Sequence, residues 1–288
     1  MKGSLLGEGI SDVSETLLIT LYCRALETRS KDPVLLDSKA VEITRKLDKE
    51  LSESGSRLRR DLAAGRVRKE LVLYIALRAR KYDEYAKKFL EKNPQGVIVN
   101  LGCGLDTRFF RIDDAKLILY DLDLPEVIEI KKKLLDETDR YHFIPSSVLD
   151  CSWMEALKQK HAGPFIFLAE GLFMYLPAAE VKKLVIKLHE TFPGSELACE
   201  VANSVVLKTP MKQITRYKFT KELHMGKNAY YSSGLSKSDE MEEWAPRIKY
   251  IDDWSFFDEK EKKLGWMRLL GCVPLIRKVQ WTVHYKLK

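Results

Sequence analysis

Long apolar runs are missing from this sequence of 288 residues, and we expect no secretion signal. The stretch LVLYIAL meets Arg78 after seven residues, whereas a membrane-spanning helix needs about 18 to 20 apolar residues. The first residues, MKGSLLGEGISDVSE, place glycine, glutamate and aspartate where a secretion signal needs an unbroken apolar core. We therefore expect a soluble protein without a membrane partner.

Paired cysteines are also missing. The five cysteines are odd in number and widely separated, and none belongs to a CxxC pair. This pattern excludes a disulfide framework and a zinc site, and it favours a reducing, cytoplasmic location. The five histidines have no metal-ligand spacing, so we expect no metal. Cys103 has no visible partner base and is interpreted as a structural spacer.

Acidic residues are too few to balance the basic ones, since the net charge is +7 and the pI is about 9.0. Either an anionic partner such as RNA or a solvated basic surface would explain this excess. Lysines and arginines are spread along the chain beside nearly as many acids. We therefore favour the solvated surface and expect no nucleic-acid partner.

The hydrophobic pattern changes once along the chain. Residues 12–93 place apolar residues three and four positions apart with charges opposite, which predicts a helical N-terminal layer. From residue 96, short apolar strands alternate with helices, which is typical of a parallel, doubly wound sheet. Pro125 and Pro177 fall where first helical turns should begin. Five strands are expected over 96–102, 116–123, 142–148, 164–170 and 195–202.

The C-terminal third is predicted to complete this sheet. Residues 204–245 are polar and irregular. The pattern then predicts a strand over 247–257, a helix over 258–270 closed by Gly271, and a last strand with alternating faces over 277–287. The expected fold is therefore α/β with a seven-stranded sheet.

A glycine pair follows the first expected strand. Val97–Leu101 ends in Gly102 and Gly104, where absent side chains let the backbone turn tightly and approach a ligand. A dinucleotide fingerprint needs a third glycine at the position of Thr107, so NAD and FAD are disfavoured. Asp106 would instead suit the ammonium and sulfonium groups of S-adenosylmethionine. A plain strand-to-helix turn with capping acids is the alternative explanation.

Two acids end the second expected strand in the stretch YDLDLP. Asp121 and Asp123 lie about 20 residues beyond the glycines, a separation at which a carboxylate can bind ribose hydroxyls. Because the two residues share the same parity, both should project to one face of the strand. The pattern alone does not decide which of them binds.

Longer stretches carry a family resemblance. They read VIVNLGCGLDTRFFRI, LYDLDLPEVIEIKKKLL, FIFLAEGLFMYLP and DDWSFFDEKEKKLGWMRLLG, with VSETLLITLYCRALETRSKDPVLLD near the N-terminus. Together they resemble the leucine carboxyl methyltransferase family, and most of all its tetracenomycin-type branch from polyketide pathways. The resemblance extends over close to the whole chain.

This resemblance implies one domain with the Rossmann-like, seven-stranded fold of class I methyltransferases that use S-adenosylmethionine. A helical extension would cover residues 1–94, and the core would comprise residues 95–203 and 246–288. Residues 204–245, inserted after the fifth strand, would form a substrate cap. The implied activity is O-methyl transfer with release of S-adenosylhomocysteine.

The resemblance also gives roles to single residues. Arg78 matches the arginine that holds the cofactor carboxylate, and Arg80 is the alternative two positions later. Asp123 matches the ribose-binding acid. Glu170 would lie beside the methionine moiety; it also follows a buried strand, where open α/β sheets bind ligands. Tyr175 would lie over the transferred methyl group near the substrate, although it can equally be a packing residue.

One position departs from the family. After the third strand the family has an Asp-Leu pair that contacts the adenine, whereas this chain has Ser147 and Val148, followed by Asp150. The Ser147 hydroxyl could meet the adenine amino group or cap the following helix. The adenine contacts are therefore the least defined part of the predicted site.

Our sequence-based hypothesis is a carboxyl O-methyltransferase that converts a small organic acid to its methyl ester. An ionised carboxylate needs no general base, because its unperturbed pKa is about 4. Phenolic acceptors, a non-catalytic cofactor-binding sensor or scaffold, and an RNA methyltransferase are the alternatives. The oligomeric state is not predicted. The cap contains basic and aromatic residues that suit an anionic, partly aromatic acid: Arg216, Tyr217, Lys218, Phe219, Lys221, Lys227, Tyr230 and Tyr231.

Overall fold

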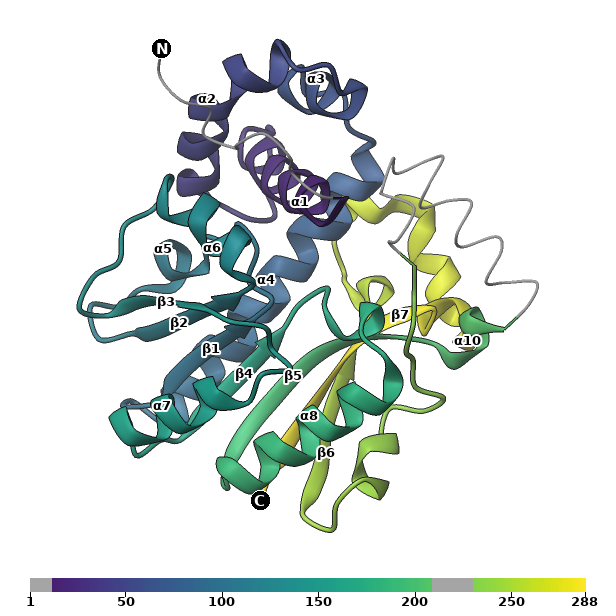
Figure 1. Cartoon of the computed structure of the whole chain (residues 1–288). Helices are drawn as coiled ribbons and strands as arrows, with labels where there is room; N and C mark the ends of the chain where they lie inside the picture. Colours follow the sequence, from purple (N-terminus) through teal and green to yellow (C-terminus); the bar gives the residue numbers. More distant parts are fainter. Residues whose placement is uncertain (1–11, 209–229) are drawn as a thin grey trace.

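The first three N-terminal helices lie together above one end of a central sheet, and the fourth runs down along one face of the sheet (Figure 1). The computed structural model describes residues 12–208 and 230–288. Apolar residues at helical spacing explain this layer, because the buried face of each helix packs against its neighbours. The predicted helical layer is confirmed. Its helices are α1 (Asp12–Thr28), α2 (Ser38–Ser52), α3 (Arg57–Ala63) and α4 (Lys69–Lys92).

The sheet has seven strands in the order β3-β2-β1-β4-β5-β7-β6. The predicted number of strands is confirmed. The first five are parallel, and β7 is antiparallel to both β5 and β6. The order reverses beside β1, and ligands of open α/β sheets bind at such a switch point. The strands are β1 (Val97–Leu101), β2 (Ile118–Asp123), β3 (Tyr141–Pro145), β4 (Phe165–Ala169), β5 (Ser195–Ala202), β6 (Ile248–Trp254) and β7 (Gln280–Leu287).

Helices cover both faces of this sheet, which explains why the central strands are buried along their whole length. Ile98 packs with α4, α5 and α6, while its neighbour Val99 packs with α7 and α8 on the other face. Pro125 opens α6 as predicted, and Pro177 caps α8. The bounds are α5 (Arg108–Ile112), α6 (Pro125–Lys132), α7 (Ser152–Lys160) and α8 (Ala178–Thr191).

The helix predicted over 258–270 is wrong. The chain instead forms the short 3-10 segments η5 (Phe256–Asp258) and η6 (Lys262–Cys272), followed by α10 (Pro274–Arg277). Gly265 has φ +51° and ψ −131°, which breaks the helical path within η6. Gly271 closes no helix; a β-carbon there would lie 2.8 Å from Cβ of Phe257, so glycine permits close packing.

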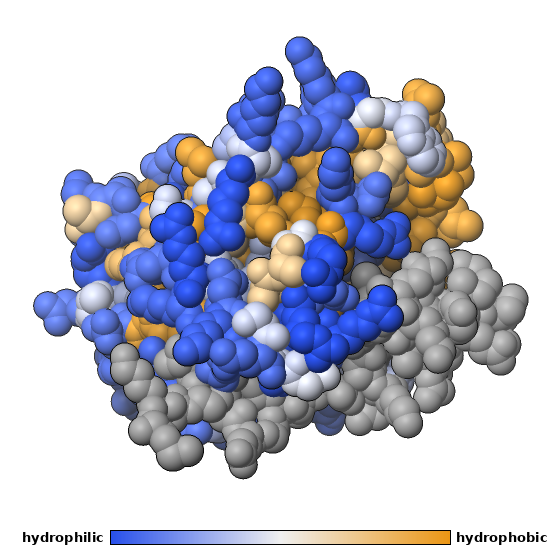
Figure 2. Space-filling view, turned by 90° about the horizontal axis from the view of Figure 1, so that it is seen from above, coloured by the Kyte–Doolittle hydropathy of each residue, from blue (hydrophilic) through white to orange (hydrophobic). Residues whose placement is uncertain are grey.

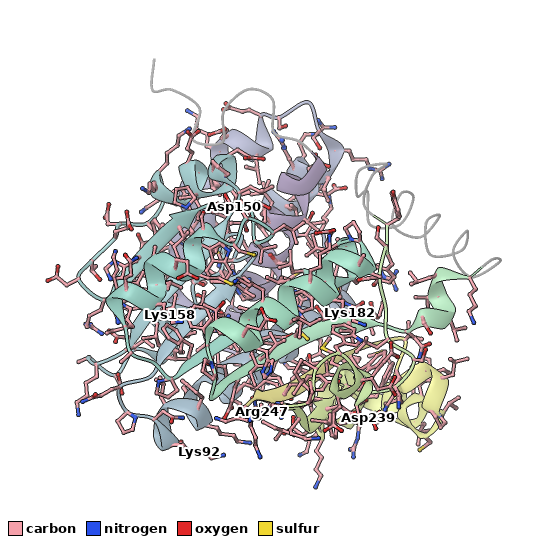
Figure 3. All side chains as sticks on the ribbon, turned by 60° about the horizontal axis from the view of Figure 1, so that its bottom comes forward. Lys92, Asp150, Lys158, Lys182, Asp239 and Arg247 are labelled. Carbon is pink, nitrogen blue, oxygen red and sulfur yellow. The ribbon has the colours of Figure 1, made fainter. Side chains whose placement is uncertain are left out.

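Charged side chains are scattered over the outer surface. In Figure 3, Lys92 on α4, Lys158 on α7 and Lys182 on α8 extend from separate elements. All three are exposed. This distribution agrees with a solvated basic surface. Among the described helices, none combines the length and apolar character that crossing a membrane requires.

Candidate functional site

A cavity lies between the N-terminal layer and the carboxyl ends of β1 and β4. Helices α1 and α4 form one wall, and the loop after β1 and the turn after β4 form the other. Gln280, at the start of β7, and Tyr231 close a third side. Six of the predicted site residues line this cavity: Arg78, Gly102, Gly104, Asp106, Glu170 and Tyr175.

The loop after β1 makes the tight turn that its glycines predict. Gly102 has φ +65° and Gly104 has φ +50°, a backbone region that favours glycine. A β-carbon on Gly102 would lie 2.9 Å from Leu172 Cδ1, and one on Gly104 would lie 2.7 Å from Leu17 Cδ2. Both glycines therefore bring the backbone close to its surroundings beside the cavity.

The Asp106 carboxylate accepts hydrogen bonds from the backbone N–H groups that a bound phosphate would need. Its Oδ1 accepts hydrogen bonds from the N–H groups of Thr107 at 2.8 Å and Arg108 at 3.1 Å, where α5 begins. The helix start therefore already holds a carboxylate in place of a pyrophosphate. This geometry suits a cofactor that has no phosphate.

Arg78 is held by two carboxylates that come from different strands. Its Nε donates to Glu170 Oε1 at 2.9 Å, and its Nη1 donates to Glu200 Oε2 at 3.0 Å. Within the described residues, Nη2 has no hydrogen-bond partner, and the side chain lines the cavity. Gly171 lies beside this guanidinium, because a β-carbon there would be 3.5 Å from Nη2. As a glycine, it places no side chain over Arg78. Arg78 can therefore still bind a carboxylate.

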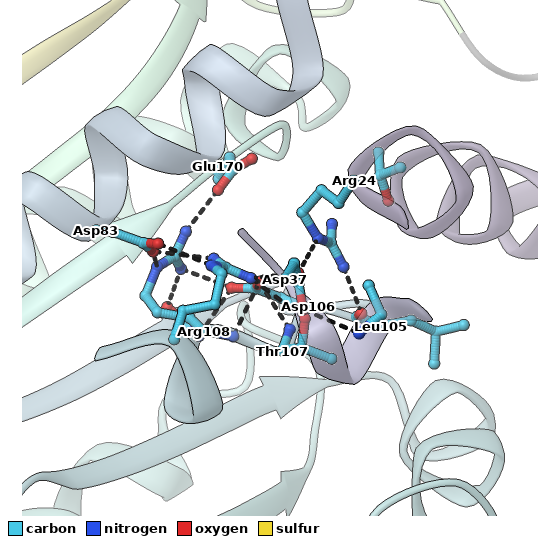
Figure 4. Close-up of polar contacts among 12 residues, drawn as sticks. Arg24, Asp37, Asp83, Leu105, Asp106, Thr107, Arg108 and Glu170 are labelled. Atoms are coloured by element: carbon cyan, nitrogen blue, oxygen red, sulfur yellow. Dashed lines mark hydrogen bonds and ion pairs between the residues drawn. The ribbon is translucent and has the colours of Figure 1, made fainter. Parts of the chain in front are cut away.

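A second, buried ion network supports the loop (Figure 4). Arg108 donates to Asp83 at 2.8 Å and to Glu170 at 2.7 Å, and it pairs with Asp106 at 2.8 Å. Arg111 bridges Asp83 and Asp106 at 2.7 and 3.0 Å. Arg24 of α1 and Asp37 extend the network into the N-terminal layer. Across the site, the four arginines 24, 78, 108 and 111 face five carboxylates: Asp37, Asp83, Asp106, Glu170 and Glu200.

These pairs keep the acids of the cavity ionised. Burial alone would raise the pKa of Glu170, but the guanidiniums of Arg78 and Arg108 outweigh it and lower that pKa. Burial is likewise outweighed at Asp106, where Arg108 and Arg111 lower the pKa. Both carboxylates are therefore weak bases near neutral pH.

The two acids of β2 have different surroundings, although both face the loop. Asp121 is buried, with Lys131 at 2.5 Å, the Tyr141 hydroxyl at 2.5 Å and the Asn100 amide at 2.8 Å. Asp123 is partly exposed and accepts the N–H of Gly104 at 2.7 Å. Burial raises its pKa, opposed by hydrogen bonds from the Gly104 and Leu124 amides. Neither lines the cavity, and of the two only Asp121 is fully buried.

Ser147 and Val148 also lie outside the cavity lining. The Ser147 hydroxyl accepts the N–H of Leu149 at 3.3 Å, so it stabilises the turn before α7. Val148 is buried in the core beneath α7, and its carbonyl accepts the indole N–H of Trp153 at 3.4 Å. Within the described part of the chain, no hydrogen bond joins either residue to the glycine loop.

The end of the cavity beyond Arg78 is aromatic. The ring of Tyr175 lies 5.8 Å from that of Tyr231, and Tyr74 lies under the Arg78 guanidinium at 5.5 Å. The Tyr74 hydroxyl donates to Glu200. Burial and, to a smaller extent, Glu200 raise the pKa of Tyr175 to about 12, so its hydroxyl stays protonated.

Other predicted residues fall elsewhere. Arg80, the alternative to Arg78, points to the surface and pairs with Glu259 at 2.7 Å and Glu261 at 2.6 Å. Most of the basic and aromatic cap residues lie in 209–229, outside the described residues. Cys103 is buried, and burial raises the pKa of its thiol, which fits a structural spacer.

Sequence reasoning missed several residues of the site, among them Glu200 and Arg108. Glu200 lies within the buried strand β5, and Arg108 lies at the start of α5 and is almost completely buried. A charged residue inside a fully buried parallel strand is unusual unless it is paired, and this signal was available for Glu200. Asp106 is a local partner of Arg108, but nothing in the local sequence identifies Asp83 and Glu170, which are far away along the chain.

Comparisons with known proteins bear on this site. One relative, the tetracenomycin polyketide synthesis O-methyltransferase TcmP of Streptomyces glaucescens, is 31% identical over 86% of this chain and 85% of its own. Another, the S-adenosyl-L-methionine-dependent methyltransferase dpfgK of Gibberella zeae, is 30% identical over 70% of each chain.

A solved structure bears on the fold, and a family model bears on the family. The crystal structure of a DUF574 family protein from Streptomyces avermitilis is 13% identical and has a TM-score of 0.53 over 92% of this chain and 96% of its own. That likeness bears on the fold alone, and it confirms the predicted Rossmann-like α/β class. The model for leucine carboxyl methyltransferase matches residues 18–189. The chain therefore belongs to the leucine carboxyl methyltransferase family, as its sequence motifs predict.

Proposed function

We propose that this enzyme transfers a methyl group to the carboxylate of a small organic acid, giving a methyl ester. The chain is an S-adenosylmethionine-dependent methyltransferase by its family and its curated relatives, so the proposal concerns the acceptor and the roles of residues. The observation that carries it is the absence of an available base among the described residues that line the cavity.

A phenolic acceptor has an unperturbed pKa of about 10 and needs a base near the transferred methyl group. The acids of the cavity, Asp106 and Glu170, are held ionised by arginines, which lower the pKa of each. No histidine or lysine belongs to the described lining. A carboxylate arrives already ionised at neutral pH and therefore needs none of these groups.

The roles of the binding residues follow from their positions. The free Nη2 of Arg78 would bind the cofactor carboxylate, and Glu170, fixed between Arg78 and Arg108, would face its ammonium group. Asp123 is preferred to Asp121 for the ribose hydroxyls, because Asp121 is buried and already bonded to three side chains. Ser147 and Val148 stay the predicted neighbours of the adenine.

S-adenosylmethionine supplies a methyl group activated by its positive sulfur. The chain itself positions the acceptor and excludes water. The protonated hydroxyl of Tyr175 would donate a hydrogen bond to the acceptor oxygen that does not receive the methyl group. In-line positioning can contribute up to roughly 7 to 11 kcal/mol in favourable cases. We assign substrate selection to residues 204–245, the predicted cap, and a cytoplasmic location to the protein.

The aromatic lining favours an acceptor with a flat, apolar body. Tyr74, Tyr175 and Tyr231 surround the end of the cavity beyond the arginine. Such a lining stacks on aromatic rings while a few polar groups orient the ligand. TcmP, whose name assigns it to tetracenomycin polyketide synthesis, is consistent with this class of small molecule. We therefore propose aromatic carboxylic acids as the first compounds to test.

The proposal is tested with S-adenosylmethionine labelled on its methyl group. The protein is incubated with cell extract separated into small molecules, proteins and RNA, and each product is treated with mild base. Label released as methanol from the small-molecule fraction is expected. Base-stable label in small molecules would indicate a phenolic ether, and label in RNA would indicate an RNA methyltransferase. Tight cofactor binding without any transfer would leave the sensor or scaffold alternative.

A further inference from the structure

The segment from Lys262 to Val279, KKLGWMRLLGCVPLIRKV, has an unusual composition for a surface. It contains five basic residues and no acidic residue. It forms η6 and α10, directly before β7. Its charge and apolar content therefore differ from the mixed surface found elsewhere on the chain, and neither is used by the proposed chemistry.

Large apolar side chains of this segment face solvent. Trp266 and Leu269 are each 71% exposed, Leu275 is 54% exposed and Val273 is 46% exposed. Leu264 is buried against Leu73 and Leu77 of α4, which anchors the segment to the N-terminal layer. In the view from above, apolar side chains gather at the right-hand edge of the molecule (Figure 2), the side on which Figure 1 places α10.

Unpaired cations accompany these apolar side chains. Lys262 and Arg268 have no ion-pair partner within the described parts of the chain, and both are exposed. The other three cations of the segment are paired. Lys263 pairs with Glu27, Arg277 pairs with Asp253 and Asp258, and Lys278 also pairs with Asp253. The exposed part of the segment therefore combines apolar side chains with cations that have no acidic partner among the described residues.

We propose that residues 262–279 form a docking surface for an anionic phospholipid bilayer. An exposed tryptophan, exposed leucines and unpaired basic residues are the combination that binds at the boundary between headgroups and acyl chains. A protein partner of matching charge would have to bury Lys262 and Arg268, whereas at a bilayer both cations stay in the hydrated headgroup layer. Such docking is peripheral, so it needs no membrane-spanning helix.

The surface also lies next to the acceptor end of the cavity. Gln280 follows the segment directly, lines the cavity, and bonds Tyr231 and Glu200 at 2.7 Å each. An apolar acid dissolved in a bilayer would thus meet the enzyme beside the place where its carboxylate is methylated. This last step rests on the proposed function, whereas bilayer docking does not.

Docking is measured by co-sedimentation of the full chain with sucrose-loaded vesicles, without cofactor or acceptor. Vesicles of phosphatidylcholine with 30% phosphatidylserine are expected to bind the protein, and pure phosphatidylcholine vesicles much less. Lys262→Gln with Arg268→Gln should weaken binding by about fivefold for each cation removed. Trp266→Ser with Leu269→Ser should abolish it. Salt at 0.5 M should weaken binding of the wild type.

The matched control is Phe110→Ser. Phe110 is 42% exposed on α5 and lies beside Tyr141 of β3, at the other edge of the sheet. This variant should bind vesicles as the wild type does, and circular dichroism should confirm that every variant folds. Equal binding by all variants, or no binding to anionic vesicles, would overturn the proposal. A dimer in analytical ultracentrifugation that Trp266→Ser with Leu269→Ser dissociates, without vesicle binding, would assign the surface to a second copy.

Discussion

Arg78 bonds two carboxylates and keeps one nitrogen, Nη2, without a hydrogen-bond partner among the described residues. Its bonds to Glu170 and Glu200 fix the plane of the guanidinium, which leaves Nη2 directed at the cavity. Because those carboxylates compensate its charge, Arg78 can remain ionised although it is buried. The residue is therefore preorganised for a ligand carboxylate before any ligand arrives.

Arg78→Lys should weaken binding of S-adenosylhomocysteine by about tenfold or more, since one ammonium group cannot keep the bonds to Glu170 and Glu200 and also offer a fixed donor to the ligand. The matched control is Arg80→Lys, two residues along the same helix. Arg80 pairs with Glu259 and Glu261 away from the cavity, so its variant should bind the cofactor within about threefold of the wild type. Isothermal titration calorimetry on folded protein measures both, and equal losses in the two variants would exclude the role given to Arg78.

Tyr175 leads to a prediction about pH. Because burial raises the pKa of Tyr175 to about 12, its hydroxyl stays a donor throughout the neutral range. A carboxylate acceptor is ionised above about pH 5, so kcat/KM should be constant within about twofold from pH 6 to pH 9. A phenolic acceptor would instead give a rate that rises about tenfold for each pH unit.

Tyr175→Phe should lower kcat while cofactor affinity stays within about twofold, because the hydroxyl is placed toward the acceptor end. Tyr120→Phe is the control, since the Tyr120 hydroxyl bonds His161 outside the cavity. A pH profile with a steep rise, or an unchanged kcat in Tyr175→Phe, would contradict a carboxylate acceptor held by this hydroxyl.

At the scale of elements, the loop after β1 is the most constrained connection of the site. Gly102→Ala places a β-carbon in the left-handed region and 2.9 Å from Leu172. The conformational cost is about 1 to 2 kcal/mol of unfolding free energy. Because the loop forms one wall of the cavity, the variant should also bind S-adenosylhomocysteine more weakly, by about tenfold.

Gly194→Ala separates these two effects. Gly194 has φ +84°, and nothing lies within 4 Å of a β-carbon there. It precedes β5 and does not line the cavity. Urea denaturation should show a similar loss of stability for both variants, while calorimetry should show weaker binding for Gly102→Ala alone. Equal binding by the two variants would mean that the glycine loop does not contact the cofactor.

The elements that the sequence predicted correctly share a simple physical cause. Strands β1, β4 and β5 are buried along their whole length and rich in apolar residues, so their composition identifies them. The segment η6 was mistaken for a helix because Leu270 lies three positions after Met267 and four after Trp266, whereas Gly265 has non-helical φ and ψ angles. The spacing of apolar residues predicts which residues share a face of a helix. It does not predict that the backbone leaves the helical path at a single glycine.

The site was predictable where a residue belongs to a short motif and unpredictable where only a distant side chain defines its role. Arg78, Gly102 and Glu170 belong to short motifs, and the structure brings them to one cavity. Glu200 acts through Arg78 across 122 positions of sequence, and no local pattern encodes such a pair. Asp106 was expected to face a cationic ligand, but its oxygens are occupied by the arginines and amides of the loop.

At the scale of the whole molecule, ion pairs join the N-terminal layer to the sheet. Asp37 and Asp83 belong to the first layer, and their partners Arg108 and Arg111 belong to the helix after β1. Breaking such a pair leaves a buried charge without compensation, which is strongly destabilising. The two layers should therefore unfold together, and stability should depend on the ionisation of these groups.

The pH dependence of stability should have an acidic and a basic limb. At Asp37, Asp106 and Glu170, burial opposes ionisation, but neighbouring arginines outweigh it and lower each pKa. Their contribution to folding is present above the unfolded pKa of about 4 and is lost as pH falls below it. The basic limb comes from His284 on β7, which lies between Glu196 at 2.9 Å and Asp252 at 3.7 Å, with Tyr85 and Lys286 also in the cluster.

Burial alone would lower the pKa of His284, but Asp252 and Glu196 outweigh it and raise that pKa. A histidine with a raised folded pKa stabilises fully below its unfolded pKa of about 6.5 and loses this contribution as pH rises through the folded pKa. The difference in unfolding free energy between the wild type and His284→Gln should thus be largest at pH 6 and should narrow toward pH 9. Urea denaturation across that range measures it. A difference that instead widens with pH would mean that His284 is neutral in the fold and that the carboxylates around it are held by Lys286 and Tyr85.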